Sequence, residues 1–360
     1  MPISANQPAR ITVRTATIAY DVWISPEAIS QLSVLLEGVR TRIAVVDANV
    51  ARLHAAHFPP ALFSRVELIE PGETSKSLPT AERLYSVLAD ARVERGDMLI
   101  AIGGGVVTDL AGFVAGTWLR GIRYISIPTT LEAAIDASVG GKTAINHAAG
   151  KNLIGVFHHP STVLIDTRFL ATLPRRDLIA GLAESVKHAL LTTPAFVAWH
   201  ETHAELIRDG DTGAMNELIA RNIQVKTDVV ARDEREAGLR AILNYGHTIG
   251  HAIEHVLEYE LRHGECVALG IVAENALAVA AGILDPTTAT RARALLHTLG
   301  LPTALPRPVD AEALLEACRV DKKVRSGKVR FALLRGIGAP VIVDHLSDAE
   351  IVGAIRTIQP

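Results

Sequence analysis

Residues 97–116 read "DMLIAIGGGVVTDLAGFVAG", an apolar run that ends in three glycines and continues as a helical pattern. This order predicts a buried strand, a tight turn and a helix, which together start a βα unit. Glycines at the turn allow a ligand close to the backbone, and the free N–H groups that open the helix favour a phosphate. The spacing is not G-x-G-x-x-G, so a simple turn is an open alternative to a pyrophosphate site.

Three similar apolar runs occur elsewhere in the first half of the chain: "RIAVVDA" (42–48), "YISIPTT" (124–130) and "TVLIDT" (162–167). Short strands that alternate with turns and amphipathic helices predict a parallel α/β sheet. After "FLATLPRRDL" (169–178), long Ala/Leu-rich helical segments dominate. We therefore expect an α/β domain over residues 1–175 and a mostly helical domain over residues 176–360, with a ligand-binding cleft between them.

The composition fits a soluble globular protein of about two domains, because 49% of the 360 residues are hydrophobic, 21% are charged and the formal net charge is -3. Nothing in it favours nucleic acid or a membrane as a partner, and we read no signal peptide at the start. Glu274 and Asn275 interrupt the most apolar stretch, which predicts a buried helix instead of a membrane span. Cys266 and Cys318 suit ordinary thiols in a reducing cytoplasm.

The stretch "PTTLEAAIDASVGGKTAINHAAGKN" (128–152) combines hydroxyls, amides, glycines and ammonium groups, which suits the binding of phosphate oxygens. We expect these groups to gather at one place, although a solvated surface loop is the alternative. Its polar members are Thr129, Thr130, Asp136, Lys142, Asn146, Lys151 and Asn152. Asp47, at the end of an earlier strand, is either a ribose-binding carboxylate or a helix cap.

The stretch "LNYGHTIGHAIEH", followed by His263 in "RHGEC", concentrates possible metal ligands. His247 and His251 share a face of the predicted helix at i and i+4, with Glu254 one turn further, and two such histidines can ligate zinc. The form H-E-x-x-H is absent, which disfavours a metalloprotease. Spacing leaves open which three donors bind, and Glu184 in "GLAESVKH" is another candidate carboxylate.

These stretches form a series: "PGETSKSL", "GGGVVTDLAGFVAGTWLRG", "IPTTLEAAIDASVGGKTAINHAAGKNLIG", "GLAESVKH", "DEREAGLRAILNYGHTIGHAIEH", "RHGECVALG" and "DKKVRSGKVRFALL". In order and spacing the series resembles the 3-dehydroquinate synthase family of sugar-phosphate cyclases, over about residues 40–340. The resemblance implies an N-terminal NAD-binding α/β domain and a C-terminal helical metal- and substrate-binding domain. It also implies an active site between the domains, and a homodimer.

Matched position by position, the resemblance implies that zinc or cobalt is bound by Glu184, His247 and His263, and that His251 contacts the substrate phosphate instead. The implied NAD contacts are Asp47, Pro71, Gly72, Glu73, Thr74, Ser75, Lys76, Gly105, Val106, Val107, Thr108, Asp109, Thr129, Thr130, Lys142, Lys151, Phe169, Leu170, Ala171 and Thr172. The implied catalytic and substrate-binding residues are Arg120, Asp136, Lys142, Asn152, Lys187, Lys226, Arg240, Asn244, His251 and one of Lys322 and Lys323.

The implied reaction converts 3-deoxy-D-arabino-heptulosonate 7-phosphate to 3-dehydroquinate and phosphate. NAD oxidises one alcohol, phosphate is eliminated, the carbonyl is reduced again and the ring closes by an intramolecular aldol step, so NAD is returned unchanged. The metal acts as a Lewis acid on the alcohol that is oxidised. We expect much of the catalysis to be positioning of the reacting atoms.

Two positions depart from the family's usual pattern, because Glu132 stands where an apolar residue is usual and His188 stands where tyrosine is common. "GGKTAIN" and "LNYGHTIGH" disfavour relatives that cyclise glucose 6-phosphate or sedoheptulose 7-phosphate. An amino-substituted heptulosonate is an alternative substrate. The rival classes are a metal-dependent polyol dehydrogenase, which releases NADH, and a non-catalytic binding protein stabilised by metal.

Overall fold

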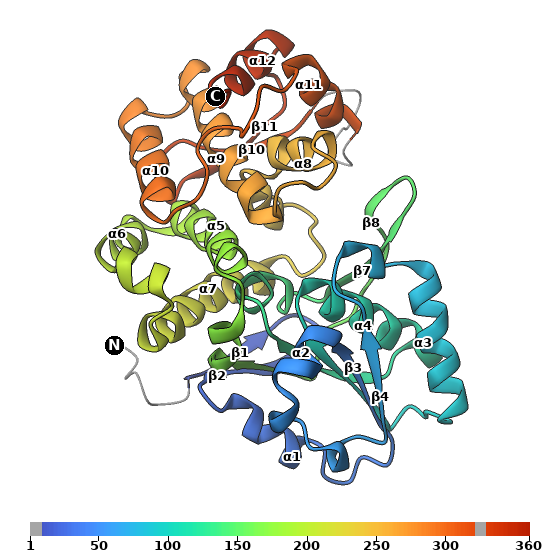
Figure 1. The fold of residues 1–360 in the computed structure, drawn as a ribbon. Helices are drawn as coiled ribbons and strands as arrows, with labels where there is room; N and C mark the ends of the chain where they lie inside the picture. Colours follow the sequence, from blue (N-terminus) through green and yellow to red (C-terminus); the bar gives the residue numbers. More distant parts are fainter. Residues whose placement is uncertain (1–8, 321–328) are drawn as a thin grey trace. The chain divides into compact units, whose positions relative to one another are not determined.

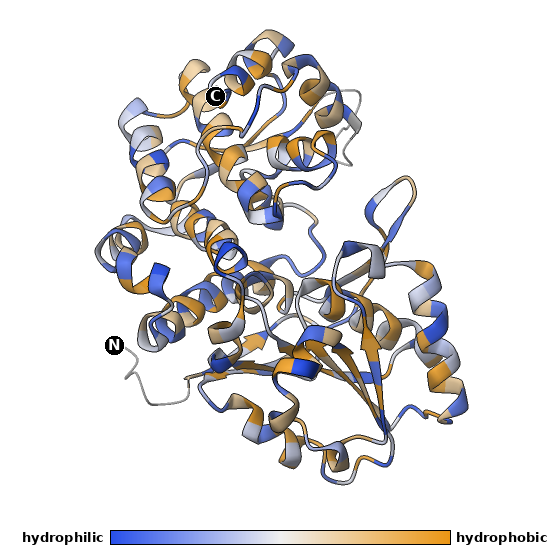
Figure 2. Cartoon of the chain, viewed as in Figure 1, coloured by the Kyte–Doolittle hydropathy of each residue, from blue (hydrophilic) through white to orange (hydrophobic). Residues whose placement is uncertain are grey.

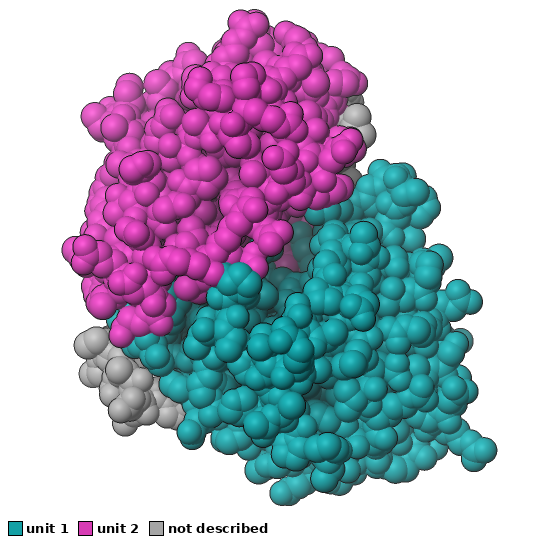
Figure 3. All heavy atoms as spheres, in the orientation of Figure 1, with its two compact units in different colours: residues 1–174, 212–235 teal, residues 175–211, 236–360 magenta. Residues whose placement is uncertain are grey.

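The computed structural model describes residues 9–320 and 329–360, and the chain divides into two compact units (Figures 1 and 3). Unit 1 comprises residues 1–174 and 212–235, and unit 2 comprises residues 175–211 and 236–360. The sequence predicts a single boundary near residue 175, and the structure differs in one helix, α7 (Thr212–Arg232). This helix packs against β1 (Ala9–Arg14) and β2 (Ala19–Ser25), so it belongs to the α/β unit.

Unit 1 is built on a seven-stranded sheet in the order β1-β2-β9-β6-β5-β3-β4. Neighbouring strands pair in parallel, except that β1 is antiparallel to β2. The remaining strands are β3 (Arg42–Asp47), β4 (Arg65–Ile69), β5 (Met98–Gly103), β6 (Arg123–Pro128) and β9 (Thr162–Asp166). The four strands predicted from the sequence are β3, β5, β6 and β9, and the predicted parallel α/β class is confirmed.

The central strands are apolar along their length because both faces of the sheet are covered (Figure 2). Ile43 and Val45 of β3 join a core cluster with residues of α3 (Leu78–Asp90) and α4 (Gly105–Thr117). Ala44 and Val46 point the other way, into a second cluster that includes Leu32 of α1 (Leu32–Leu35). Alternate residues of one strand thus serve two separate cores, as the period of a strand requires. The short helix α2 (Ala48–Leu53) follows β3.

A hairpin of β7 (Lys142–His147) and β8 (Gly150–Phe157) packs along α4. The approach depends on Gly112, because a Cβ there would lie 2.5 Å from the Cγ2 atom of Thr143. The hairpin therefore carries the lysine-rich stretch of the sequence alongside the helix that follows the three glycines.

Unit 2 is mostly helical, as predicted, and α9 (His263–Ala280) is its central helix. Around α9 pack α5 (Arg175–Thr192), α8 (His247–Val256), α10 (Pro286–Thr298) and α12 (Asp348–Arg356). The unit also contains α6 (Pro194–Asp209), α11 (Ala311–Val320) and a two-stranded hairpin of β10 (Phe331–Leu334) and β11 (Pro340–Val343). Among the described helices α9 has the length and composition of a membrane span, but 72% of it is buried inside the protein, as expected for a core helix.

Candidate metal centre and cofactor-binding edge

Three possible metal ligands converge within unit 2. Glu184 lies on α5, His247 is the first residue of α8 and His263 is the first residue of α9. The Nε2 atoms of His247 and His263 lie 3.2 Å and 3.5 Å from the same Oε1 atom of Glu184. One donor atom from each of the three residues lies within 4.8 Å of the other two, so a single cation can contact all three.

The second nitrogen of each imidazole has its own partner. The Nδ1 atom of His247 lies 3.0 Å from the carbonyl oxygen of Tyr245, and the Nδ1 atom of His263 lies 3.6 Å from the Oε2 atom of Glu254. A carbonyl oxygen only accepts hydrogen bonds, so Nδ1 of His247 carries the proton and Nε2 presents its lone pair. Partners of this kind orient a metal-binding imidazole, and the sequence had marked Glu254 only as a neighbour on the same helix.

The electrostatics of the cluster favour a cation. Burial by itself raises the pKa of Glu184, but the Lys187 ammonium, in an ion pair with Oε2, holds that pKa well below its usual range. Burial, followed by the charge of Lys187, lowers the pKa of His247 to about 3. The cluster therefore offers an ionised carboxylate and a neutral imidazole, the forms in which these side chains bind metal.

The donor set fits zinc or cobalt. The Oε2 atom of Glu184 pairs with the Lys187 ammonium, whereas the buried Oε1 atom, which faces the two histidines, accepts no well-aligned hydrogen bond within the described parts of the chain. A buried charged oxygen without a donor is costly, and a cation between Glu184 and the two imidazoles would remove that cost. Mixed nitrogen and oxygen donors accept either zinc or cobalt.

A second donor group in unit 2 consists of His251, Glu254 and His263. The ring of His251 lies 5.4 Å from the ring of His247 and 5.9 Å from that of His263. His263 is common to both groups, but it faces Glu184 with Nε2 and Glu254 with Nδ1. This arrangement favours the Glu184 group over the i, i+4 pair of His247 and His251 that helix spacing by itself would select.

Two other predicted residues lie in the segment before α8. Arg240 is buried in the short helix Leu239–Asn244, and the Asn244 side chain donates to the Oε1 atom of Glu236 over 3.4 Å. Both residues thus lie within seven residues of His247 along the chain. The remaining predicted lysines, Lys322 and Lys323, lie outside the described residues.

In unit 1 the three glycines join β5 to α4, and the atoms around Gly103 and Gly104 leave very little space for a side chain. A Cβ on Gly103 would lie 2.7 Å from that of Val107, and one on Gly104 would lie 3.0 Å from the Cγ2 atom of Thr130. Gly104 is the N-cap of α4 and has no side chain to bond the first N–H groups of the helix. The start of α4 therefore keeps the polarity that favours an anion. Val107 and Thr108 are buried, so an NAD contact from these two residues, which stays a prediction, would come from their backbone N–H groups.

Asp47 caps a helix, which is one of the two roles that the sequence predicts for it. Its Oδ1 atom accepts from the backbone N–H groups of Asn49 over 2.8 Å and Val50 over 3.3 Å, at the start of α2. A carboxylate has capacity for further donors, so the ribose contact stays a prediction.

The segment of residues 71–76 is fixed to the rest of unit 1 by polar contacts that the sequence did not reveal. The Lys76 ammonium pairs with Asp109 over 2.5 Å, and the pKa of Asp109 is raised by burial in spite of that pair. The Asn146 side chain donates to the Oε1 atom of Glu73 over 2.8 Å. Lys76, Asp109 and Glu73, all expected to contact NAD, are thus engaged with protein partners.

The lysines of the hairpin are not gathered at one place, contrary to the sequence-based expectation. Lys142 begins β7 and pairs with Phe157, whereas Lys151 follows the turn at the far end, where His147 pairs with Gly150. His147 is five residues beyond Lys142 along the extended strand, a span of about 16 Å. Extended backbone, which the composition of the stretch did not indicate, is the physical reason.

Other predicted contacts are distributed along unit 1. The Lys226 ammonium on α7 binds the backbone oxygen and the Oδ1 atom of Asp136, so two expected substrate contacts bind each other. The backbone N–H of Asn152, at a φ of 55°, donates to the Oδ1 atom of Asn146 over 3.0 Å. Arg120 follows the opposite end of α4 from Gly105, and the helix between them is about 18 Å long.

The threonines and the segment of residues 169–172 divide into buried and exposed groups. Thr129 is buried and its N–H donates to the Gly103 oxygen over 3.0 Å. Phe169 and Leu170 are buried, and Phe169 packs edge to face on His54, so their predicted NAD contacts stay predictions for the backbone of this segment. Ala171 and Thr172 are exposed, and the Thr172 hydroxyl lies 2.7 Å from the Nε2 atom of His54.

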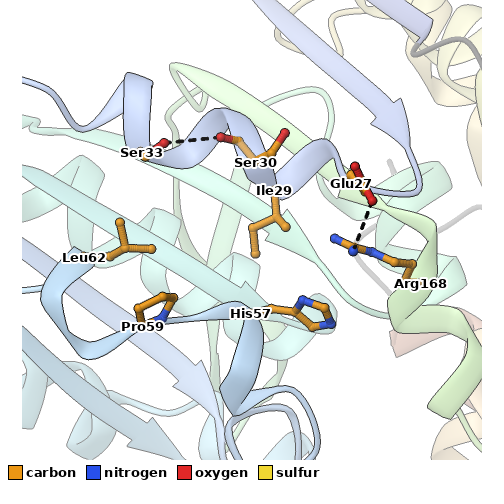
Figure 4. Close-up of a pocket in the computed structure, with 8 residues that line it drawn as sticks. All are labelled: Glu27, Ile29, Ser30, Ser33, His57, Pro59, Leu62 and Arg168. Atoms are coloured by element: carbon orange, nitrogen blue, oxygen red, sulfur yellow. Dashed lines mark hydrogen bonds and ion pairs between the residues drawn. The ribbon is translucent and has the colours of Figure 1, made fainter.

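A surface pocket of unit 1 borders the predicted contact Phe169, whose ring lies 6.2 Å from that of the lining residue His57 (Figure 4). An ion pair of 4.0 Å joins Glu27 and Arg168 at one side of it. The lining residues are Glu27, Ile29, Ser30, Ser33, His57, Pro59, Leu62 and Arg168. This set shares no member with the predicted site residues, so the pocket is not assigned to the reaction.

Residues 66–180 match the 3-dehydroquinate synthase N-terminal domain, and residues 181–324 match the 3-dehydroquinate synthase C-terminal domain. The chain belongs to the 3-dehydroquinate synthase family. The 3-dehydroquinate synthase of Rhodospirillum rubrum is 44% identical over 368 residues, which cover 98% of this chain and 95% of that protein. Relatives of this kind support the specific function, so the chain is a carbocycle-forming cyclase that makes 3-dehydroquinate.

Two solved structures share the fold over nearly the whole chain. One is a 2-deoxy-scyllo-inosose synthase complexed with carbaglucose-6-phosphate, NAD+ and Co2+, with a TM-score of 0.88, 25% identity and coverage of 97% of this chain and 99% of that one. The other is a 2-epi-5-epi-valiolone synthase from Streptomyces hygroscopicus subsp. jinggangensis with NAD+ and Zn2+ bound, with a TM-score of 0.86, 30% identity and coverage of 96% and 98%. Both fall in the class of sugar-phosphate cyclases that the sequence motifs resemble.

Proposed function

We propose that this member of the family is a phosphate-eliminating lyase that uses NAD and one divalent cation, zinc or cobalt. Its substrate is 3-deoxy-D-arabino-heptulosonate 7-phosphate, the substrate of the family to which the chain belongs. The observation that carries the cofactor assignment is the convergence of Glu184, His247 and His263 in one donor group of unit 2. The NAD and the Co2+ or Zn2+ in the two related cyclases support it.

Glu184, His247 and His263 would bind the cation. When bound, the cation supplies Lewis acidity, which lowers the pKa of a substrate hydroxyl. Lys187 contributes by keeping Glu184 ionised, since its ammonium binds the carboxylate oxygen that does not face the histidines. Tyr245 and Glu254 hold the imidazole rings through their Nδ1 atoms, so that both rings turn the same nitrogen toward Glu184.

His251, Arg240 and Asn244 are proposed to bind the substrate. The His251 ring lies beside the rings of both histidine ligands without belonging to the Glu184 group, so it can donate to an anionic substrate group next to the cation. Arg240 offers a guanidinium, and charge-assisted hydrogen bonds to carboxylate or phosphate are the strong ones. Lys322 or Lys323 is proposed to add a second cation for the same purpose.

In unit 1 the start of α4 is proposed to bind the NAD pyrophosphate, and Asp47 a ribose hydroxyl. When bound, NAD supplies the hydride acceptor, and the protein orients it. The remaining proposed NAD contacts are Pro71, Gly72, Glu73, Thr74, Ser75, Lys76, Gly105, Val106, Val107, Thr108, Asp109, Thr129, Thr130, Phe169, Leu170, Ala171 and Thr172. The proposed substrate contacts in unit 1 are Arg120, Asp136, Lys142, Asn152 and Lys226. Lys142 and Lys151 are also proposed to contact NAD.

The function is tested with purified protein, a catalytic amount of NAD and the heptulosonate phosphate. Release of phosphate and 3-dehydroquinate without net NADH is the expected result. NADH in proportion to turnover would instead indicate a polyol dehydrogenase. A parallel assay with the amino-substituted heptulosonate phosphate is expected to release phosphate much more slowly, and faster release would move the substrate assignment to that compound.

The metal is tested by elemental analysis and by reconstitution. Dialysis against a chelator should abolish turnover, and Zn2+ or Co2+ should restore it at about one ion per chain.

We further propose, from the family resemblance, a homodimer that works in the cytoplasm. Analytical ultracentrifugation of the purified protein checks the assembly, and a sedimentation coefficient of a monomer would contradict it.

A further inference from the structure

Glu274 is a buried carboxylate in an otherwise apolar helix, and the proposed reaction gives it no role. It lies in the second half of α9 with no measurable exposure, between Ala273 and Asn275. Placing a carboxylate in such surroundings is costly unless its oxygens receive hydrogen bonds. The contacts of these oxygens therefore show what the residue does.

The Glu274 carboxylate caps a different helix. Its Oε2 atom accepts from the backbone N–H of Gly246 over 2.7 Å, and its Oε1 atom accepts from the N–H groups of Thr248 over 3.0 Å and Ile249 over 3.1 Å. These groups belong to the N-cap and first turn of α8, where the N-cap residue Gly246 has no side chain of its own. The cap that a serine or aspartate at the N-cap would ordinarily give is thus supplied from α9.

The residue enclosed by these three hydrogen bonds is His247. The backbone is held at Gly246 on one side of it and at Thr248 and Ile249 on the other. The next residue of α9 adds a contact on the same segment, since the Tyr245 hydroxyl donates to the Oδ1 atom of Asn275 over 2.7 Å. Tyr245 also supplies the carbonyl oxygen that binds Nδ1 of His247, so its position fixes the imidazole directly.

The same helix carries a second proposed ligand, because His263 is the first residue of α9. Close contact between α8 and α9 is built in by glycine: a Cβ on Gly270 would lie 1.9 Å from the Gly246 oxygen, and one on Gly250 would lie 3.0 Å from the Cys266 oxygen. Figure 1 shows α8 beside α9. One helix therefore sets the position of one histidine at its own start and of the other through Glu274.

We propose that Glu274 is a positioning residue for the metal centre. Its carboxylate holds the first turn of α8 in place, so that His247 meets Glu184 and His263 in ligand geometry. The inference rests on the proposed metal function of that cluster. The charged oxygens of Glu274 make the cap rigid, because hydrogen bonds to a carboxylate are stronger than those between neutral groups. Loss of the cap frees the turn that begins with His247 and weakens metal binding without removing any ligand.

The test compares Glu274→Ala and Glu274→Gln with Leu277→Ala, which removes a fully buried apolar side chain from the same helix and serves as the stability control. Affinity of the metal-free protein for Zn2+ is measured by chelator competition, and the visible absorption of bound Co2+ reports ligand geometry. Thermal unfolding of the metal-free protein is measured in parallel. NAD affinity, a property of the proposed site in unit 1, is the internal control for folding.

We expect Glu274→Ala to weaken Zn2+ binding by roughly 10-fold to 100-fold and to change the Co2+ spectrum. Glu274→Gln should lose less, because its amide oxygen can still accept from Thr248 and Ile249, whereas its NH2 group faces the N–H of Gly246. Leu277→Ala should lower the unfolding temperature with little effect on metal affinity. Tyr245→Phe, which removes only the hydrogen bond to Asn275, is expected to give a smaller loss of affinity than Glu274→Ala.

The inference is overturned if Glu274→Gln and Glu274→Ala lower the unfolding temperature but bind Zn2+ as the wild type does, because the cap is then only structural. If Glu274→Ala does not fold, Glu274→Gln and Tyr245→Phe carry the same comparison. The proposed metal function fails in a different way. In that case His263→Ala binds Zn2+ as tightly as the wild type, whatever the Glu274 variants show.

Discussion

Gly264 is the position at which one added methyl group should separate the proposed metal ligands. It follows His263 at the start of α9, and this end of the helix lies against α5, which carries Glu184. A Cβ on Gly264 would lie 1.9 Å from the backbone oxygen of Ala180 and 2.6 Å from its carbonyl carbon. Both obstacles are backbone atoms of a buried helix, so no side-chain rotation relieves the clash.

The size of the effect follows from that distance. Cβ atoms essentially never approach other heavy atoms within 3.0 Å, so Gly264→Ala must move α9 away from α5 by about 1 Å. Metal–ligand distances tolerate only about 0.2 Å, and His263 moves with the start of α9. We expect Zn2+ affinity to fall by about 100-fold, which corresponds to about 2.8 kcal/mol. Overpacking should also cost about 1–3 kcal/mol of stability in the metal-free protein.

The assay is chelator competition for Zn2+, with thermal unfolding of the metal-free protein beside it. Gly353→Ala is the matched control, since Gly353 lies in α12 of the same unit and an added Cβ there meets no atom within 4 Å. The control should bind Zn2+ normally and be slightly more stable, because alanine favours a helix by about 1 kcal/mol over glycine. Normal Zn2+ affinity in Gly264→Ala would show that contact between α5 and α9 does not set the ligand geometry.

Three further predictions concern single side chains. His263→Ala should lose bound Zn2+ and nearly all turnover. His251→Ala should keep the metal, as measured by elemental analysis, and lower kcat/KM by about 10-fold to 100-fold. Loss of metal in His251→Ala would instead favour His247 and His251, at i and i+4, as the ligand pair. Lys142→Ala should raise the KM for the heptulosonate phosphate or for NAD by an amount equivalent to about 1.5–3 kcal/mol, and unchanged KM values would exclude Lys142 from both contacts. Burial by itself raises the pKa of Asp97, but the Arg40 guanidinium and the N–H groups of Glu94 and Thr41 hold that pKa below its usual value. Because the folded-state pKa is lowered, the stability that Asp97 contributes is present above pH about 3.9 and is lost as the pH falls through the folded-state pKa. Urea unfolding should therefore show Asp97→Asn less stable than the wild type at pH 7, with the difference shrinking at acidic pH, and a constant difference would contradict the assignment.

Local patterns in the chain were enough to place the main strands and the class of the fold. β3, β5, β6 and β9 are continuous apolar runs because both of their faces are buried, and such a run is visible without knowledge of its neighbours. The motif series also indicated the family, since the order and spacing of its residues are properties of the sequence. Glu274 could be recognised as an interruption that made a membrane span implausible, but its partners could not be named.

Contacts between segments far apart in the chain could not be read in this way. Three examples join residues at least 25 positions apart. They are the packing of α7 in unit 1, the ion pair of Lys76 with Asp109, and the cap that Glu274 provides for α8. Helix spacing correctly placed His247 and His251 on neighbouring turns, yet the meeting of Glu184, His247 and His263 depends on how α5, α8 and α9 pack. Periodicity and propensity act over a few residues, whereas ligand geometry is set by the packing of helices whose glycines allow close approach, and that information is distributed over the whole of unit 2.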